Sequence, residues 1–282
     1  MRVLFTDLDG TLLHPHTYSF EAAKPALEAL QREGIPLVLC TSKTRSEVEF
    51  WRRRLGNADP FIVENGGAVY IPSGYFPFPV PEARERDGYE VVEFGTPYPE
   101  LVETLRICAR ESGCEVMGFH DMSVAELAVC TLLPVRQAEL AKQREYDEAF
   151  EIRGTGSYRL LEAIEAHGLR WTRGDRFYHI TGPNDKAAAV RILTTLFARA
   201  FGSAVTVGVG DGHNDATFLN TVDIPVIVQS RFATALARAV PHSLVSLAPG
   251  PHGWNDAVLQ VLAGAAFTAG AGAGRSLTAG GR

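Results

Sequence analysis

Short apolar runs alternate with longer amphipathic stretches in the first part of the chain. The apolar runs Val3–Thr6 and Ile35–Cys40 are each followed by a polar loop. Helical spacing then follows over Phe20–Glu33 and from Thr44 onward, where Thr44-Arg45-Ser46-Glu47 has the capping-box pattern of a helix start. Strands that alternate with helices in this way predict a parallel sheet.

The middle of the chain has a different pattern. Two apolar runs, Pro60–Glu64 and Ala68–Pro72, flank Asn65-Gly66-Gly67, which predicts a hairpin that leaves the sheet. The proline-rich stretch 72–81 is typical of a linker. Beyond it, helical and strand patterns mix without the strand-helix rhythm, and this indicates an inserted domain.

The rhythm resumes after Gly182. We expect a helix over Asp185–Phe201, strands at Ala204–Val209 and Ile224–Val228, and a helix from Arg231. The fold expected is α/β, with a doubly wound parallel-sheet core and an inserted α/β cap domain. The expected boundaries are 1–81 and 179–263 for the core, 82–178 for the cap and 264–282 for a flexible Ala/Gly-rich tail.

Composition narrows the class of protein. With 27 basic and 33 acidic residues the net charge is −6, which argues against a nucleic-acid partner and an anionic membrane surface. The four cysteines have no metal-ligand or disulfide spacing, and the sequence has neither a signal peptide nor an 18-residue apolar run. We therefore expect a cytoplasmic protein with reduced thiols, and a small anionic ligand held by local arginines remains compatible with this composition.

Two acidic clusters lie about 200 residues apart in the sequence. Asp7-Leu8-Asp9-Gly10-Thr11 follows the first apolar run, and Gly210-Asp211-Gly212-His213-Asn214-Asp215 follows the run that ends at Val209. If these runs are adjacent parallel strands, the four carboxylates meet at the sheet edge where such folds place their active sites. Negative charges at such short distances repel one another, so this arrangement of carboxylates requires a cation. Because the ligands are oxygen atoms, the expected cation is Mg²⁺.

The spacing within the clusters suggests roles. Asp7 is expected to be the nucleophile that forms an aspartyl phosphate, and Asp9, two residues on, the general acid and base on the same side. Asp211 is expected to bind the metal directly and Asp215 to bind or orient it, while Asn214 holds the phosphate or the nucleophile. Taken alone, each motif also fits an ordinary turn or helix cap.

Two further polar residues follow from their places in the predicted elements. Thr41 ends an apolar strand and could offer its hydroxyl to a phosphate at a helix start. Lys186 lies at the start of a helix, where the helix dipole disfavours a cation, so its charge suggests an anionic partner. Lys43 is a weaker candidate for a phosphate contact.

These residues, in this order, resemble the four motifs of the haloacid dehalogenase superfamily of phosphohydrolases. Further stretches resemble the mannosyl-3-phosphoglycerate phosphatase family within it. These stretches are Cys40-Thr41-Ser42-Lys43-Thr44-Arg45, Glu64-Asn65-Gly66-Gly67, Gln143-Arg144-Glu145-Tyr146-Asp147 and Gly174-Asp175-Arg176-Phe177-Tyr178-His179. At Asp175 that family often has a second glycine.

The resemblance implies a haloacid dehalogenase-like core with a substrate-specificity cap and Mg²⁺-dependent hydrolysis of mannosyl-3-phosphoglycerate to mannosylglycerate, a compatible solute. Basic cap side chains suit a substrate that carries a carboxylate and a phosphate. The substrate-binding residues expected are Ser42, Lys43, Asn65, Gly66, Gly67, Arg144, Arg170, Arg173, Arg176, His179 and Asn214. A phosphatase for glucosyl-3-phosphoglycerate or hexose phosphates, a phosphosugar mutase and a non-catalytic phosphoacceptor switch are the alternatives.

Overall fold

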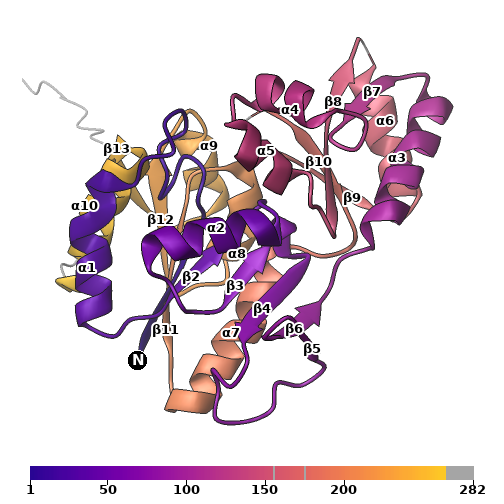
Figure 1. Ribbon diagram of the computed structural model, residues 1–282. Helices are drawn as coiled ribbons and strands as arrows, with labels where there is room; N and C mark the ends of the chain where they lie inside the picture. Colours follow the sequence, from indigo (N-terminus) through magenta and orange to yellow (C-terminus); the bar gives the residue numbers. More distant parts are fainter. Residues whose placement is uncertain (155, 175, 265–282) are drawn as a thin grey trace, which may run out of the picture.

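The computed structural model describes residues 1–154, 156–174 and 176–264 (Figure 1). These residues form a core built on a nine-stranded sheet and a cap built on a four-stranded sheet. Asp175 and most of the predicted tail 264–282 lie outside the described residues.

The large sheet is mixed. In spatial order its strands are β13 (Leu244–Pro249), β12 (Ile224–Gln229), β11 (Val205–Gly210), β1 (Arg2–Thr6), β2 (Leu37–Cys40), β3 (Phe61–Val63), β4 (Ala68–Pro72), β6 (Tyr89–Glu93) and β5 (Arg84–Arg86). The strands from β13 to β3 are parallel, and β4, β6 and β5 extend the sheet antiparallel. The α/β class with a parallel-sheet core is therefore confirmed, and the antiparallel strands are an addition to it.

Helices cover both faces of this sheet, because successive strand residues point to opposite faces. Leu4 of β1 packs toward α1 (Lys24–Arg32), α2 (Arg45–Leu55) and α10 (Gly250–Leu262). Val3 and Phe5 pack on the other face, toward α7 (Lys186–Phe201), α8 (Ala216–Leu219) and α9 (Ala233–Ala239). A short 3-10 helix, Glu21–Ala23, precedes α1. The core is thus wound on both sides, as expected.

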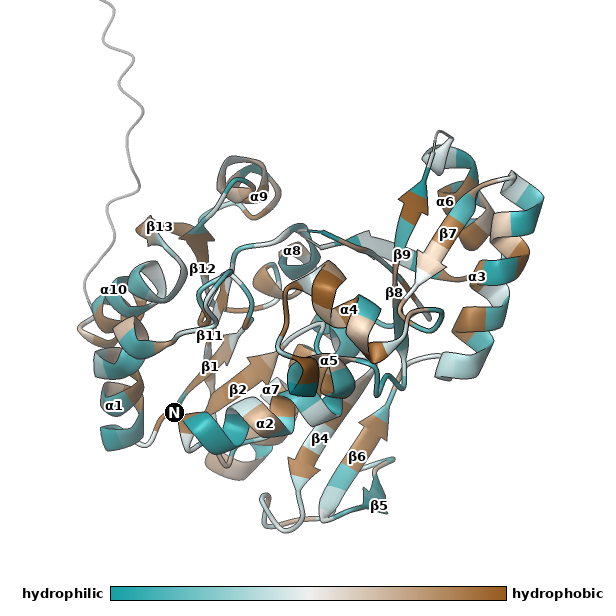
Figure 2. Cartoon of the chain, turned by 45° about the horizontal axis from the view of Figure 1, so that its top comes forward, coloured by the Kyte–Doolittle hydropathy of each residue, from teal (hydrophilic) through white to brown (hydrophobic). Residues whose placement is uncertain are grey.

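The cap sheet is antiparallel throughout, in the order β7 (Glu115–Gly118), β8 (Asp147–Arg153), β10 (Tyr178–Thr181) and β9 (Arg170–Arg173). Its buried side chains also alternate: Phe150 packs with α3 (Tyr98–Ser112) and α6 (Ser157–Ala166), and Ala149 with α4 (Val124–Thr131) and α5 (Val135–Ala141). Figure 2 shows hydrophobic residues along strands of the core sheet such as β2 and β6, whereas the edge strand β5 is hydrophilic.

The strand pairing bears on the predicted domain limits of 82 and 178. Strands β5 and β6 pair with β4 in the core sheet, and β10 pairs within the cap. The proline-rich stretch packs on the core, with Phe76 and Val80 buried there. The proline-rich composition is typical of a linker and gives no sign that the chain pairs again with the core sheet. From the strand pairing we propose residues 96–182 as the cap.

Two local features fix how the chain enters the helices near the site. Thr44 and Glu47 make both hydrogen bonds of the predicted capping box, and α2 begins after Thr44. Asp185 accepts from the Ala188 amide at 2.8 Å, so α7 begins at Lys186. The turn after β3 contains Asn65 at φ 56° and a short 3-10 helix, and it leads into β4 within the sheet rather than out of it.

The two connections between core and cap lie side by side. A Cβ on Gly182 would lie 2.4 Å from Thr96 Oγ1 and 2.8 Å from the Thr96 amide nitrogen. The outgoing and returning chains therefore form one narrow junction. Among the described helices, none has the length and apolar character needed to cross a membrane.

Candidate active site

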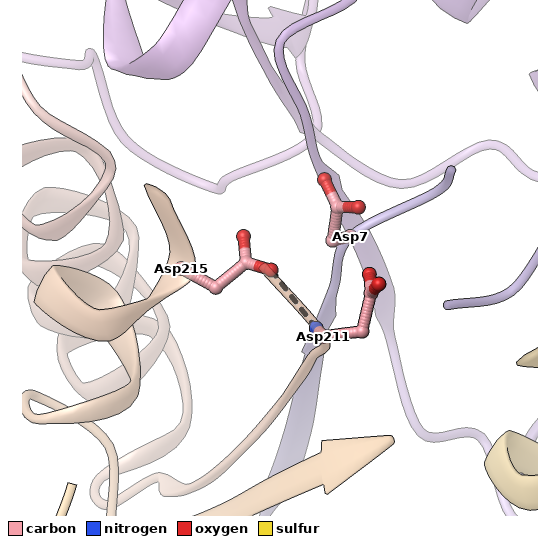
Figure 3. Close-up of side chains that lie close together, drawn as sticks. All are labelled: Asp7, Asp211 and Asp215. Atoms are coloured by element: carbon pink, nitrogen blue, oxygen red, sulfur yellow. Dashed lines mark hydrogen bonds between the residues drawn. The ribbon is translucent and has the colours of Figure 1, made fainter. Parts of the chain in front are cut away.

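The two acidic loops meet at the carboxyl end of the parallel strands. Strands β1 and β11 pair in parallel with Thr6 opposite Val209, and the Asp7 amide donates to the Val209 carbonyl at 2.9 Å. Figure 3 shows the side chains of Asp7, Asp211 and Asp215 gathered at this point. One carboxylate oxygen from each lies within 4.8 Å of the others. Residues far apart in sequence thus form one acidic cluster.

Lys186 is the cation inside this cluster. Its Nζ lies 2.9 Å from Asp7 Oδ1 and 2.7 Å from Asp215 Oδ1, and the residue is only 1% exposed. The two carboxylates compensate the unfavourable position of a lysine in the first turn of α7, and they raise the pKa of Lys186 despite its burial. The lysine is therefore charged.

One lysine does not balance three carboxylates. Burial raises the pKa of Asp7 to about 7, against the opposing effect of Lys186 and with a further contribution from Asp215. Burial likewise raises the pKa of Asp211 well above its ordinary value, and Asp215 adds to the shift. The excess of negative charge and the set of oxygen donors fit a divalent cation such as Mg²⁺.

Glycines and hydrogen bonds hold the carboxylates in place. Asp215 Oδ2 accepts from the amides of Asp211 and Gly212, both at 3.0 Å, and Thr11 Oγ1 donates to Asp211 Oδ1 at 2.6 Å. A Cβ on Gly10 would lie 2.7 Å from Asp211 Oδ2, and one on Gly210 would lie 2.6 Å from Asp215 Oδ2. Only glycine permits these close approaches.

Asp9 does not join the three carboxylates, contrary to its expected place as a metal ligand beside Asp7. Strand geometry ends at Thr6, and the chain turns so that the Leu13 amide donates to the Leu8 carbonyl at 2.7 Å. Asp9 Oδ2 instead lies 2.8 Å from Lys43 Nζ, while its buried Oδ1 has no hydrogen-bond partner. The alternation that predicted a shared side does not persist past the strand.

Thr41 and Lys43 follow β2 at the same sheet edge. Thr41 is 1% exposed, and its Oγ1 accepts from the Lys43 amide at 3.2 Å. Lys43 Nζ also lies 3.3 Å from Glu47 Oε1, so this lysine is held by two carboxylates. The shorter of its two ion pairs is the one with Asp9.

Core and cap together line a cavity of about 440 Å³. The core contributes Asp7, Asp9 and Asp211 at one end. Of the substrate-binding residues predicted from the sequence, the cavity wall includes Ser42, Lys43, Arg144, Arg173, Arg176, His179 and Asn214.

Four of the predicted substrate-binding residues are not part of this wall. Asn65 donates to Asp147 Oδ2 at 2.7 Å, and Gly66 and Gly67 belong to the same tight turn. Arg170 Nη1 lies 3.6 Å from Asp185 Oδ2. These four residues, which were predicted from the family resemblance, therefore lie around the site and do not line the cavity.

The structure adds residues that the sequence reasoning did not single out. Their side chains are aromatic or basic. Phe177 and His213 lie within the motifs quoted above, whereas nothing in the local sequence marks the others. The further cavity-lining residues of this kind are His16, Tyr18, Phe119, Phe177, His213, Arg231 and Phe232. His213 packs against Phe232 with ring centroids 4.7 Å apart.

Comparison with known proteins identifies the family. Residues 4–76 match the family model of haloacid dehalogenase-like hydrolases. A glucosyl-3-phosphoglycerate/mannosyl-3-phosphoglycerate phosphatase of Methanococcoides burtonii is 40% identical over 92% of this chain and 97% of its own. A mannosyl-3-phosphoglycerate phosphatase of Pyrococcus furiosus is 37% identical over 81% of this chain and 91% of its own.

Solved structures agree on the fold. A subclass IIB sugar phosphatase of the haloacid dehalogenase superfamily aligns over 93% of this chain and 99% of its own, with a TM-score of 0.63 at 17% identity. The sucrose-phosphatase of Synechocystis sp. PCC6803 aligns over 92% and 98%, with a TM-score of 0.59 at 15% identity. With the sequence relatives covered almost end to end, the chain belongs to the mannosyl-3-phosphoglycerate phosphatase family of haloacid dehalogenase-like hydrolases.

Proposed function

We propose that this protein is a Mg²⁺-dependent phosphatase that hydrolyses mannosyl-3-phosphoglycerate or glucosyl-3-phosphoglycerate to the sugar glycerate and phosphate. The observation that carries the proposal is the cluster of Asp7, Asp211, Asp215 and Lys186, because two of its members, Asp7 and Asp211, line a cavity that is also lined by arginines of the cap. The names of the relatives in the family supply the two sugars. A sugar glycerate of this kind is a compatible solute.

Asp7 is the proposed nucleophile. Lys186 contacts its Oδ1, and the carboxylate can bond to phosphorus as the bond from phosphorus to the glycerate oxygen breaks. Asp9 gives a proton to the departing oxygen. It then takes one from the water that cleaves the aspartyl phosphate, which returns Asp7 and releases phosphate. The partnerless Asp9 Oδ1 is the atom available for this transfer.

Asp7, Asp211 and Asp215 are the residues that would hold Mg²⁺. When bound, the ion neutralises negative charge on the carboxylates and on the phosphoryl oxygens. Lys186 contributes a further fixed positive charge. Thr41 and Asn214 are proposed to hold the phosphate from the ends of β2 and β11, the strands on either side of β1.

The cap supplies positive charge for the rest of the substrate. Arg173 stacks on Tyr178 at 5.1 Å, and Arg176 donates to the Cys130 carbonyl at 3.2 Å. Neither has an acidic partner among the described residues, whereas Arg144 lies 2.7 Å from Asp147. We propose that Arg173 and Arg176 bind the glycerate carboxylate, because guanidinium groups match that geometry.

Phosphate release by the purified protein tests the proposal. The substrates are mannosyl-3-phosphoglycerate, glucosyl-3-phosphoglycerate and simple hexose phosphates, each with Mg²⁺ and with a chelator. The expected result is turnover of the two phosphoglycerates that stops with the chelator. Turnover of hexose phosphates alone, transfer of phosphate within the sugar, or a long-lived phospho-enzyme without release would each replace this function by another.

A further inference from the structure

Asp147 is a fully buried carboxylate that the proposed chemistry does not use. It opens strand β8 of the cap sheet and is 0% exposed. Its oxygens accept hydrogen bonds from three side chains, which come from both the core and the cap. We refer to Asn65, Arg144, Asp147 and His179 as the Asp147 cluster.

Two of the donors are cavity-facing residues of the cap side. Arg144 Nη2 lies 2.7 Å from Asp147 Oδ1, and His179 Nδ1 lies 2.8 Å from the same oxygen. Both residues line the cavity. Because Asp147 contacts Nδ1, the second ring nitrogen of His179 stays free of this contact. One carboxylate thus orients two side chains of the substrate wall.

The third donor belongs to the core. Asn65 Nδ2 lies 2.7 Å from Asp147 Oδ2, and its Oδ1 accepts from Asn214 Nδ2 at 3.2 Å. Asn214 is part of the second acidic loop, beside Asp215. Arg144 Nη2 also donates to the Ser42 carbonyl at 3.1 Å. The Asp147 cluster therefore joins the cap to the two core loops that carry the proposed phosphate contacts.

The charge balance supports a fixed arrangement. Burial alone would raise the pKa of Asp147, but His179 and Arg144 hold that pKa below its ordinary value. The carboxylate is thus ionised, and a buried ionised carboxylate needs all its donors. If the cap moved away from the core, the Asp147 carboxylate would lose its hydrogen bond from Asn65, and Arg144 would lose its hydrogen bond to the Ser42 carbonyl.

We propose that Asp147 is a positioning residue that fixes the cap over the core and, with the same two oxygens, sets Arg144 and His179 against the substrate. The effect belongs mainly to the part of the substrate beyond the phosphate, since the Asp147 carboxylate bonds directly to Arg144 and His179 of the cavity wall but to none of the three clustered carboxylates, and reaches Asn214 only through Asn65. This inference rests on the proposed phosphatase function for its kinetic readout, and a second readout is independent of it.

The kinetic test compares a large and a small substrate. Asp147→Asn should lower kcat/KM by about 10- to 100-fold for the better sugar phosphoglycerate, because misplaced contacts far from the chemistry cost this much. For p-nitrophenyl phosphate, which does not reach the cap wall, the change should be under about threefold. A merely structural defect reduces the folded fraction and so lowers both rates equally. Equal losses, or no loss, would overturn the proposal.

A second variant covers the case in which Asp147→Asn does not fold. Asn65 has φ 56°, which glycine adopts without strain, so Asn65→Gly removes the core donor and keeps the turn. It should change the ratio between the two substrates in the same direction. An unchanged ratio would count against the cluster.

The control is Glu148→Gln, the neighbouring buried carboxyl of β8. Glu148 accepts from the His120 amide and the Tyr98 hydroxyl, both within the cap. The ratio between substrates should stay at the wild-type value.

Hydrogen exchange gives the readout that does not need an active enzyme. Amides of the junction, residues 94–98 and 181–185 apart from Pro97 and Pro183, should exchange about tenfold faster in Asp147→Asn and Asn65→Gly than in the wild type and in Glu148→Gln. Unchanged exchange would reject the proposal whatever the activity. If the wild type releases no phosphate from any ester, the proposed function fails while this measurement still decides the role of Asp147.

Discussion

Asp7 is surrounded by opposing electrostatic effects. It is 6% exposed, and it shares the site with two other carboxylates and one lysine. Lys186 keeps one of its oxygens in a defined direction, while burial, with a further contribution from the neighbouring acids, raises its pKa. A divalent cation held by the three carboxylates would offset this repulsion.

Replacing Asp7 by Asn should abolish turnover without unfolding the protein. We expect kcat for the sugar phosphoglycerate to fall by at least about 10³-fold, because the nucleophile is lost. The Tm should not fall, since the change removes one of three crowded charges and leaves Lys186 paired with Asp215. Phosphate release and thermal unfolding measure the two effects, and activity near the wild-type level would exclude Asp7 as the nucleophile.

Arg176→Ala should weaken binding and leave the chemical step nearly intact. We expect KM to rise about tenfold or more, because a charge-assisted contact to a carboxylate is lost, while kcat changes little. Steady-state kinetics with the sugar phosphoglycerate measure both constants. Arg136→Ala, an exposed cap arginine outside the cavity, is the matched control. An unchanged KM in Arg176→Ala would remove this residue from the substrate contacts.

A site residue can be predicted from the sequence when a local element, such as a strand end or a helix start, determines its position. Asp7 and Asp211 follow strand ends and Lys186 begins a helix, so the order of these motifs along the chain was enough to predict that the three residues lie close together. The direction of Asp9 depends on a turn that the strand pattern cannot describe. The position of Asp147, which accepts hydrogen bonds from Asn65, Arg144 and His179, depends on domain packing, and no local signal marks it.

At the scale of elements, the start of α7 lies directly against the turn that follows β3. A Cβ on Gly66 would lie 2.2 Å from the Asp185 carbonyl oxygen and 2.8 Å from the Lys186 amide nitrogen. Gly66 also has φ 87°. The turn and the helix start therefore fit together only because residue 66 is glycine.

Gly66→Ala should destabilise the protein and disturb Lys186. We expect the free energy of unfolding to fall by about 3 kcal/mol, from the positive φ together with the steric overlap with backbone atoms. Gly74→Ala is the control: its φ is 76°, but its Cβ would meet nothing within 4 Å, so the loss should be about 1 kcal/mol. Urea unfolding measures both, and equal losses would contradict the packing argument.

The elements themselves were predictable where the pattern is local. Strands β1, β2, β11 and β12 and the capped helix α2 follow from apolar runs and from Thr44 and Glu47. Strands β5 and β6 were assigned to the cap, because prolines precede them and their pairing with β4 is set by the tertiary fold. Strand β13 and helix α10 were not predicted as separate elements.

At the scale of the molecule, core and cap enclose the cavity, and the acidic cluster lies at its core end. A divalent ion that binds only the folded arrangement stabilises the whole core. The size of the effect depends on the ion concentration relative to its Kd.

Mg²⁺ should raise the Tm by about 5 °C at 100 times its Kd, as expected from about 2.7 kcal/mol of binding free energy in a protein of this size. Asp211→Asn should reduce this rise to under about 1 °C, because it removes a charged ligand. Asp223→Asn, a change at a carboxylate that accepts from Thr206 outside the cluster, should keep the full rise. The same rise in all three proteins, measured by thermal unfolding over an Mg²⁺ titration, would place the ion elsewhere.

The position of β1 between β2 and β11 has a consequence for biosynthesis. The partner strand β11 lies 203 residues after Arg2, so one edge of β1 stays unpaired while the ribosome makes the whole intervening chain. The cap sheet, by contrast, is complete once Thr181 has emerged. The nascent chain can thus finish the cap sheet first, and it acquires the carboxylates of Asp211 and Asp215 only after strand β11 has been made.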